Sequence, residues 1–157
     1  MRDHRFQALG AAPKIVERLL RVFPRDGYDQ RPHQESLTCR EIFALLSDTE
    51  EIILDRIRTA NRQPGSTVPW YDPTERAREK HYNEKDPFHE AEVFESRRIM
   101  TLEYLEPLTV EDYKKTISLE GHGSVSIDEY IVMTMAHDIE RISELSEFLA
   151  NEVATIS

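Results

Sequence analysis

Apolar residues recur every three or four positions in four segments of the 157-residue chain, and this spacing predicts four amphipathic helices. The first helix is expected to begin near Ala12-Pro13, since proline is tolerated in a first turn, and to end before Pro24. The second is expected to begin at a capping box of Thr38 and Glu41 and to end at Gln63-Pro-Gly65. Their inward-facing stripes are Ile15, Val16, Leu19, Leu20 and Phe23, and then Ile42, Phe43, Leu45, Leu46, Ile53, Leu54 and Ile57.

The third and fourth helices carry equally clear start signals. Asp86 is placed to cap the third helix, with Pro87 in its first turn, and the periodic pattern continues to about Leu105. A second capping box, Ser126-Ile-Asp-Glu129, opens the fourth helix, which is expected to run to about Ala154. The inward positions expected on these two helices are Ala91, Phe94, Leu102 and Leu105, and then Tyr130, Thr134, His137, Arg141, Leu145 and Phe148.

The connections between the helices set the predicted topology. Residues 62–86 are enough to return along the whole bundle, so the second and third helices are expected to run parallel, with a short helix inside 73–82. A single helical turn at 109–112 and a small hairpin with strands 115–119 and 124–127 are expected before the fourth helix. The sequence therefore predicts one all-α domain over residues 1–157, a four-helix bundle with a long crossover between helices two and three.

Charge and cysteine content narrow the classes of function. Thirty acidic residues against twenty basic ones give a formal net charge of −10, which argues against binding to a nucleic-acid backbone. Cys39 is the single cysteine, so no intramolecular disulfide can form. The sequence shows neither the apolar core of a signal peptide nor an apolar run of about 18 residues. We therefore expect a cytoplasmic protein without a membrane partner.

The most informative polar residues lie on the apolar stripe of the fourth helix. His137 and Arg141 are four positions apart, so they lie one above the other on the same helix face. Two histidines at this spacing would form half of a metal site, but a guanidinium stays protonated at neutral pH and does not bind a metal ion. Position 141 therefore decides between a metal centre and another kind of polar site.

Two helix signatures of the DinB-like superfamily have similar sequences in this chain. The block Leu37–Glu50 resembles its second-helix signature, in which a capped helix continues as aliphatic-aliphatic-small-His-aliphatic-small-Asp. The blocks Gly121–Tyr130 and Ala136–Ile142 resemble its last-helix signature, which ends in His-Asp-x-x-His. The resemblance implies a four-helix bundle with a parallel crossover, divalent-metal enzymes among its members, several of them thiol-dependent transferases or hydrolases, and a homodimer.

The resemblance also implies a degenerate metal site in this chain. Metal-binding members hold the ion with three histidines, and the matching positions here are Leu45, His137 and Arg141. Two of the three histidines are missing. A catalytic site of the zinc type needs three protein ligands and one open position, so the inherited site is expected to be empty.

Three readings of this region stay open at the level of sequence. His137, Asp48 and Glu41 together could rebuild a site for nickel, zinc or manganese, against the positive charge of Arg141. Alternatively, Arg141 replaces the metal ion and pairs with Asp48 or Glu41. In the third reading the bundle centre is a pocket for a small molecule, lined by His137, Arg141, Asp48, Leu45 and Thr134, with Arg141 placed to hold an anionic group.

The other reactive and aromatic residues have simpler interpretations. Cys39 lies in the first turn of the second helix, where the helix dipole lowers thiol pKa values, yet an isolated cysteine there is more often passive. His81, His89 and His122 are interpreted as surface residues. Trp70 and Tyr71 either attach the crossover to the bundle or line a pocket.

Two functional hypotheses follow. One is a non-metal ligand-binding or interaction module with a degenerate metal site. The other is a divalent-metal-dependent thiol transferase or hydrolase with a rebuilt site. Elemental analysis of the purified protein distinguishes them.

Overall fold

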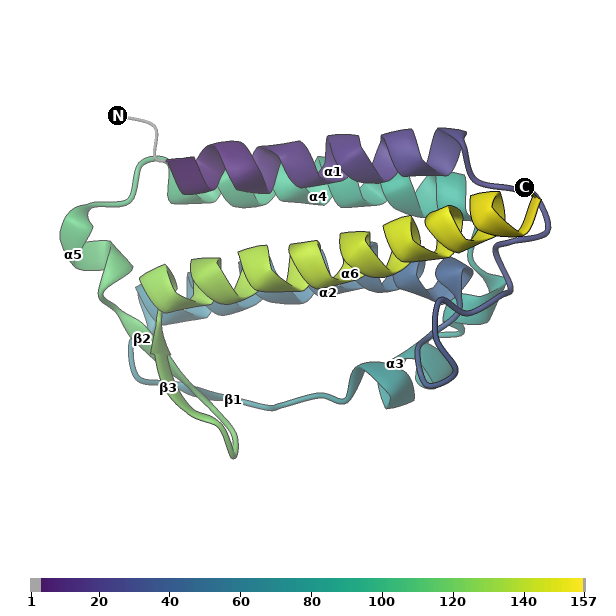
Figure 1. Ribbon diagram of the computed structural model, residues 1–157. Helices are drawn as coiled ribbons and strands as arrows, with labels where there is room; N and C mark the ends of the chain where they lie inside the picture. The colour runs from purple at the N-terminus through teal and green to yellow at the C-terminus, as the bar shows by residue number, and fades with distance from the viewer. Residues whose placement is uncertain (1–3, 157) are drawn as a thin grey trace.

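Four long helices form the body of the molecule. The computed structural model describes the backbone of residues 4–156 and the side chains of residues 4–152. The long helices are α1 (His4–Arg21), α2 (Cys39–Arg62), α4 (Pro87–Leu105) and α6 (Ile127–Ile156). Helices α1 and α4 lie together as one pair, and α2 and α6 form the second pair (Figure 1). The predicted all-α four-helix bundle is confirmed.

The second and third long helices run in the same direction, as predicted. Helix α2 packs against both α4 and α6, and α1 completes the square by packing against α4 and α6. Figure 1 shows α2 and α4 running from the end of the bundle near the loop 22–38 to the end that carries α5. Helices α1 and α6 run in the opposite direction. The crossover, residues 63–86, makes this arrangement possible because it returns the chain along the full length of the bundle.

The helix ends follow the capping signals at three of the four long helices. Thr38 and Glu41 form the capping box of α2, and Asp86 caps α4, with Pro87 in its first turn. At α6 the backbone N–H of Glu129 donates to the Ser126 hydroxyl over 3.0 Å. The predicted start of the first helix is wrong: α1 begins by His4, so Pro13 lies inside it rather than in its first turn.

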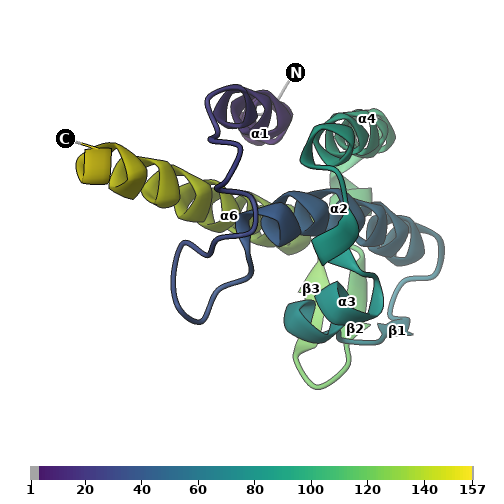
Figure 2. The ribbon, with the colours of Figure 1, turned by 90° about the vertical axis from the view of Figure 1, so that its right-hand side faces the viewer.

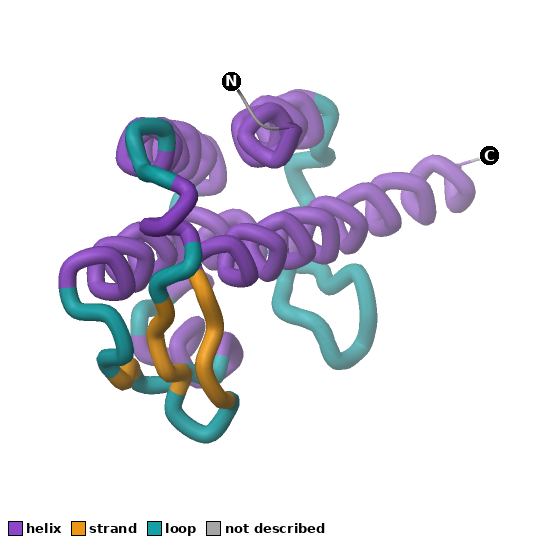
Figure 3. The backbone as a smooth tube through the Cα atoms, turned by 90° about the vertical axis from the view of Figure 1, so that its left-hand side faces the viewer, coloured by secondary structure: helices purple, strands orange, loops and turns teal. Residues whose placement is uncertain are grey.

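The crossover and a small sheet cover one face of the bundle. The crossover contains strand β1 (Thr67–Val68), the expected short helix α3 (Pro73–Glu79) and a 3-10 turn η1 (Tyr82–Glu84). Before α6 the chain forms the one-turn helix α5 (Val110–Tyr113) and the predicted hairpin of β2 (Thr116–Leu119) and β3 (Gly123–Ser126). Strand β1 adds to β2 in parallel, which the sequence did not predict because two residues carry no alternation pattern. Figures 2 and 3 show α3 and the strands on the side of α2 and α6 that faces away from α1 and α4.

The hydrophobic core is divided into two large clusters along the bundle axis. One cluster lies around Phe23, Phe43 and Phe148, near the beginning of α2. The other lies around Ile57 and Tyr130, near the hairpin. Between them several buried residues are polar or charged. The residues of this kind from the four-helix body are Ser47, Thr49, Glu50, Arg56, Arg98, Thr101, Thr134 and Asp138.

A buried guanidinium joins all four long helices at the centre of this polar layer. Arg98 of α4 is 1% exposed and donates to Glu50 of α2 over 2.8 Å through both Nε and Nη2. It donates to Asp138 of α6 over 2.7 Å and 2.9 Å, and to the Leu9 carbonyl of α1 over 2.8 Å. A guanidinium has five N–H donors, and all five are used here. We call these four residues the Arg98 network.

Pro13 explains why the Leu9 carbonyl is available to Arg98. In an α-helix the carbonyl of residue i−4 accepts from the N–H of residue i, and proline has no N–H. Pro13 lies inside α1, so the carbonyl of Leu9 has no donor at that position. Arg98 supplies the missing hydrogen bond over 2.8 Å. Pro13 led to the wrong predicted start of the first helix, and in the structure it leaves the Leu9 carbonyl free to accept from Arg98.

We predict that Arg98→Met lowers the free energy of unfolding by about 3–5 kcal/mol, because it leaves two buried carboxylates without their cation. Urea or guanidinium denaturation measures this change. Arg97→Met is the matched control: Arg97 is half-buried, its ion pair with Glu51 spans 3.3 Å, and its loss should change stability by about 1 kcal/mol or less. Arg98→Lys keeps the charge, and its effect on the free energy of unfolding should lie between those of Arg97→Met and Arg98→Met. Equal effects of the 97 and 98 variants would contradict the central role of the network.

Candidate functional site

A cavity lies where the crossover passes over α2 and α6. Its volume is about 310 Å³, within the range of sites for small molecules. Helix α2 contributes Thr49, Ile53 and Arg56, which are spaced to share one helix face. Helix α6 contributes Tyr130, Met133, Thr134, His137 and Glu140, and the remaining walls come from Trp70, Tyr71, Pro73 and Leu119. We call it the crossover cavity.

His137 is a neutral imidazole in this cavity. Burial, reinforced by the positive charges of Arg141 and Arg98, lowers the pKa of His137 from 6.5 to about 4. At neutral pH the ring can therefore accept one hydrogen bond and donate one, and it carries no charge. Thr134, one turn earlier on α6, donates its hydroxyl to the Tyr130 carbonyl over 2.9 Å. The structure thus brings together two of the residues that the sequence placed in a central pocket.

Thr49 lines the same cavity and has a buried hydroxyl with no hydrogen-bond partner among the described residues. The residue is 4% exposed, and its Oγ1 finds no donor or acceptor. Leaving a buried hydroxyl unpaired costs about 1–3 kcal/mol. Such a group in a cavity wall is typical of a position where a ligand or a water molecule completes the hydrogen bond.

Arg56 is the cationic group of the cavity. Its side chain is buried and donates to the Pro69 carbonyl in the crossover, and to the Tyr130 hydroxyl over 3.4 Å. Its guanidinium also lies over the ring of Tyr71, 5.4 Å from the ring centre. Arg56 therefore links α2, α6 and the crossover around the cavity. This role of Arg56 is not apparent from the sequence because an arginine on an amphipathic helix is usually a surface residue, although its spacing from Thr49 and Ile53 indicates a shared helix face.

The aromatic residues of the crossover serve both of the roles that the sequence left open. Trp70 and Tyr71 line the cavity. Trp70 also stacks on His122 at the tip of the hairpin, with ring centres 3.8 Å apart, so it attaches the crossover to the sheet. His122 is exposed apart from this contact, and His81 and His89 are surface residues, as predicted.

The predicted pairing of Arg141 with Asp48 or Glu41 is wrong. Arg141 forms ion pairs along its own helix, with Glu140 over 2.7 Å and Glu144 over 2.8 Å. Neighbouring carboxylates on α6 supply its counter-charge through Nη2, while its buried Nε has no hydrogen-bond partner among the described residues. An internal ion-pair network does exist in the bundle, but it is built on Arg98.

Asp48 and Glu41 are engaged elsewhere. Asp48 binds Arg76 of α3 over 2.5 Å and accepts from the Tyr82 hydroxyl, so it ties α2 to the crossover. Burial favours the protonated acid, but these two hydrogen bonds outweigh it and lower the pKa of Asp48. Glu41 is occupied as the capping-box residue of α2. Neither lines the crossover cavity with His137.

The candidate metal ligands are therefore not brought together. Within residues 4–152, no group of three histidine, cysteine, aspartate or glutamate side chains has a geometry that could hold a metal ion. Leu45, which the resemblance places at the position of the family's first histidine, is buried in a cluster with Ala44, Ala77 and Tyr82. At the three positions that the resemblance assigns to the ion, the chain has one imidazole, one buried aliphatic group and one ion-paired guanidinium, and these do not make up the donor set of a metal site.

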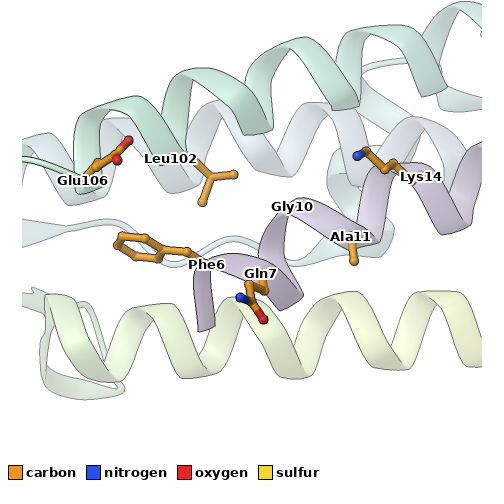
Figure 4. Close-up of a pocket in the computed structure, with 7 residues that line it drawn as sticks. All are labelled: Phe6, Gln7, Gly10, Ala11, Lys14, Leu102 and Glu106. Atoms are coloured by element: carbon orange, nitrogen blue, oxygen red, sulfur yellow. The ribbon is translucent and has the colours of Figure 1, made fainter. Parts of the chain in front are cut away.

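Two remaining features carry no site of their own. Cys39 is fully buried, and burial raises the pKa of its thiol to about 12, so it stays protonated and unreactive at neutral pH. A groove of about 350 Å³ lies between α1 and α4 (Figure 4). Figure 4 shows Lys14 and Glu106 near its opposite ends, with Phe6 and Leu102 between them, so its charged groups do not converge.

The part of the chain that the structure describes contains no helix with both the length and the apolar composition needed to cross a membrane.

Comparison with known proteins identifies a family and a fold. The model of the DinB superfamily matches residues 8–145. No curated protein gives a significant match. The structure of YfiT from Bacillus subtilis, described as "a probable metal-dependent hydrolase with an unusual four-helix bundle topology", superposes with a TM-score of 0.91 at 15% identity, covering 96% of this chain and 86% of YfiT.

Two further structures share the fold at lower similarity. The mycothiol-dependent maleylpyruvate isomerase gives a TM-score of 0.72 at 13% identity, covering 90% of this chain and 59% of the isomerase. This chain therefore spans less than two thirds of that enzyme. The DinB-like protein YjoA from Bacillus subtilis gives a TM-score of 0.67 at 17% identity, covering 96% of this chain and 92% of YjoA. At these identities the likeness concerns the fold alone.

We predict that acidification destabilises the protein through His137. The unfolded histidine takes up a proton near pH 6.5, whereas the folded one does so only near pH 4, so the free energy of unfolding falls as the pH drops through this window. The loss should reach at most about 3 kcal/mol. The free energy of unfolding of the wild type and of His137→Gln is measured in urea between pH 4 and 7. The difference between the two proteins isolates the contribution of His137, because the carboxylates are the same in both. A pH-independent difference would contradict the burial of a neutral imidazole.

A second prediction concerns metal content. Because Leu45 and Arg141 replace two ligands, the dialysed protein should contain no stoichiometric nickel, zinc or manganese. Elemental analysis by mass spectrometry measures this directly, with the dialysis buffer as the blank. An equimolar ion that survives dialysis would overturn the interpretation of a degenerate site.

Proposed function

This chain belongs to the DinB superfamily, and from that premise we propose that it binds a small molecule in the crossover cavity. In this proposal the side chains of the cavity take the place of the family's histidine-bound metal ion. The cavity lies on the bundle face that the crossover covers, and its volume of about 310 Å³ suits a ligand of one ring or a short chain. We propose further that residues 1–157 act as one domain, since the Arg98 network joins all four long helices.

The observation that carries this proposal is the unpaired hydroxyl of Thr49. Buried polar groups in native proteins are nearly always hydrogen-bonded, and the exceptions need an explanation. Thr134 and Thr101 in the same polar layer both satisfy their hydroxyls with a carbonyl of the preceding helical turn. Thr49 alone among these three threonines leaves its hydroxyl unpaired, and it is one of the two that line the cavity.

The alternative function, a metal-dependent transferase or hydrolase, rests on relatives rather than on residues of this chain. YfiT is described as metal-dependent, and the maleylpyruvate isomerase as dependent on mycothiol. The carboxylates that would rebuild the site, Asp48 and Glu41, are bound to Arg76 and to the backbone of Thr38. We therefore derive no reaction step through a metal. A homodimer and a cytoplasmic location, which the family resemblance and the composition suggest, stay predictions.

The proposal predicts opposite effects of Thr49→Val on stability and on binding. Removing the unpaired hydroxyl should raise the free energy of unfolding of the ligand-free protein by about 1 kcal/mol, since valine has nearly the same shape. Thr101→Val, the control on α4, loses a satisfied hydrogen bond of 3.2 Å and should lower stability by a similar amount. Urea denaturation measures both changes.

Binding is tested with benzyl alcohol as a neutral probe. Titration should shift the methyl resonances of Ile53 and Met133, which line the cavity, in a saturable manner, and Thr49→Val should weaken the binding. The Thr101→Val control should bind as the wild type does. If neither benzyl alcohol nor benzoate produced saturable shifts at these methyl groups, the cavity would not be a ligand site.

A further inference from the structure

Two buried arginines in this bundle have very different surroundings. Arg98 and Arg56 are 1% and 6% exposed. Arg98 faces two carboxylates and uses all five of its N–H donors. Arg56 has no carboxylate partner among the described residues, and its two protein acceptors are the Pro69 carbonyl and the Tyr130 hydroxyl. Three of its five donors (5 − 2) are thus left without a partner there.

A buried cation without a counter-charge is unusual. Charged groups are rarely fully buried unless they are paired, because removing them from water is costly. The ring of Tyr71, 5.4 Å from the guanidinium, provides only a weak attraction. Among the described residues, Arg56 is therefore a buried cation without a carboxylate partner.

No nearby carboxylate is available to fill this role. Glu140 lines the cavity, but its Oε1 is bound to Arg141 over 2.7 Å. Glu50 is held by Arg98, and Asp48 by Arg76. Each of these acids is already bound to another arginine, so none of them pairs with the guanidinium of Arg56 in the wall of the crossover cavity.

We propose that the ligand of the crossover cavity is a small organic carboxylate, with Arg56 binding the carboxylate and Trp70, Tyr71 and Tyr130 enclosing an apolar body. The assignment rests on the proposed function of the cavity and adds the chemical class of its ligand. A guanidinium matches the planar, two-oxygen geometry of a carboxylate, and three free donors suffice for a bidentate contact. The aromatic walls favour an unsaturated or aromatic body over a fully hydrated ion such as phosphate.

The test compares three probes on the full chain. Benzoate and benzyl alcohol have the same ring and differ in charge, whereas inorganic phosphate supplies charge without an apolar body. From methyl shifts of Ile53 and Met133, benzoate should bind about tenfold or more tightly than benzyl alcohol, the ratio expected for one charge-assisted hydrogen-bond pair. Phosphate should bind more weakly than benzoate.

Variants assign the preference to Arg56. Arg56→Met should reduce the preference for benzoate to within about twofold, whereas Arg56→Lys, which keeps the charge and loses the planar fork, should retain part of it. Arg62→Met is the control, because it removes the same charge from an exposed position of the same helix and should leave the preference unchanged. Since the wild-type preference is measured first, the test does not depend on the folding of any variant.

The outcomes separate this inference from the proposed function. Equal binding of benzoate and benzyl alcohol would keep the cavity as a ligand site and overturn the carboxylate. Phosphate binding as tight as that of benzoate would overturn the organic ligand. A benzoate preference that survives in Arg56→Met would overturn the role of Arg56. No saturable shift with any probe would overturn the proposed function itself.

Discussion

The hydrogen bonds of one buried guanidinium hold the geometry of this bundle. Arg98 contacts each of the other three long helices, through Glu50, Asp138 and the Leu9 carbonyl, and none of its donors is left over. Apolar contacts alone tolerate sliding of one helix along another, whereas a planar fork with fixed acceptors does not. The network therefore sets the relative height and rotation of four helices whose two apolar clusters lie on either side of it.

The position of the candidate site follows from this constraint. Glu50 is preceded by Thr49, and Asp138 by His137, so each acid of the network is next in sequence to a residue that lines the crossover cavity. Successive residues of a helix point about 100° apart. When the acids face the centre of the bundle, their neighbours are turned toward the face that the crossover covers. The same interaction that joins the helices thus orients two polar groups of the cavity.

The fold of this chain is shared with a protein of very different sequence. The chain superposes on YfiT with a TM-score of 0.91 although only 15% of the residues are identical, so the arrangement of helices is retained while the side chains change. In this chain Arg56 and Arg76 attach the crossover to α2, through the Pro69 carbonyl and Asp48. The cavity that results is cationic at Arg56, uncharged at His137 and aromatic along the crossover. These properties favour an anionic organic ligand over a metal ion.

The sequence by itself determined the elements whose signals are local. The capping box at Thr38, the cap at Asp86 and the turn at Gly121 depend on residues a few positions apart, and the helices and hairpin beside them are present as predicted. That two of the family's three metal-binding histidines are replaced in this chain stays a prediction from the resemblance. The start of α1 was not predictable from the sequence. Pro13 leaves the Leu9 carbonyl without its helical donor, and this carbonyl accepts instead from Arg98, which is 89 positions away from Leu9.

Only the tertiary structure decided which charges pair. Arg98, Arg56 and Arg141 look alike in the sequence, each on an amphipathic helix near acidic residues. Arg98 is paired with distant carboxylates and Arg141 with carboxylates of its own helix, whereas Arg56 has no carboxylate partner in the part of the chain that the structure describes. Electrostatic pairing depends on distance and burial rather than on sequence spacing, and both are set when the helices and the crossover pack.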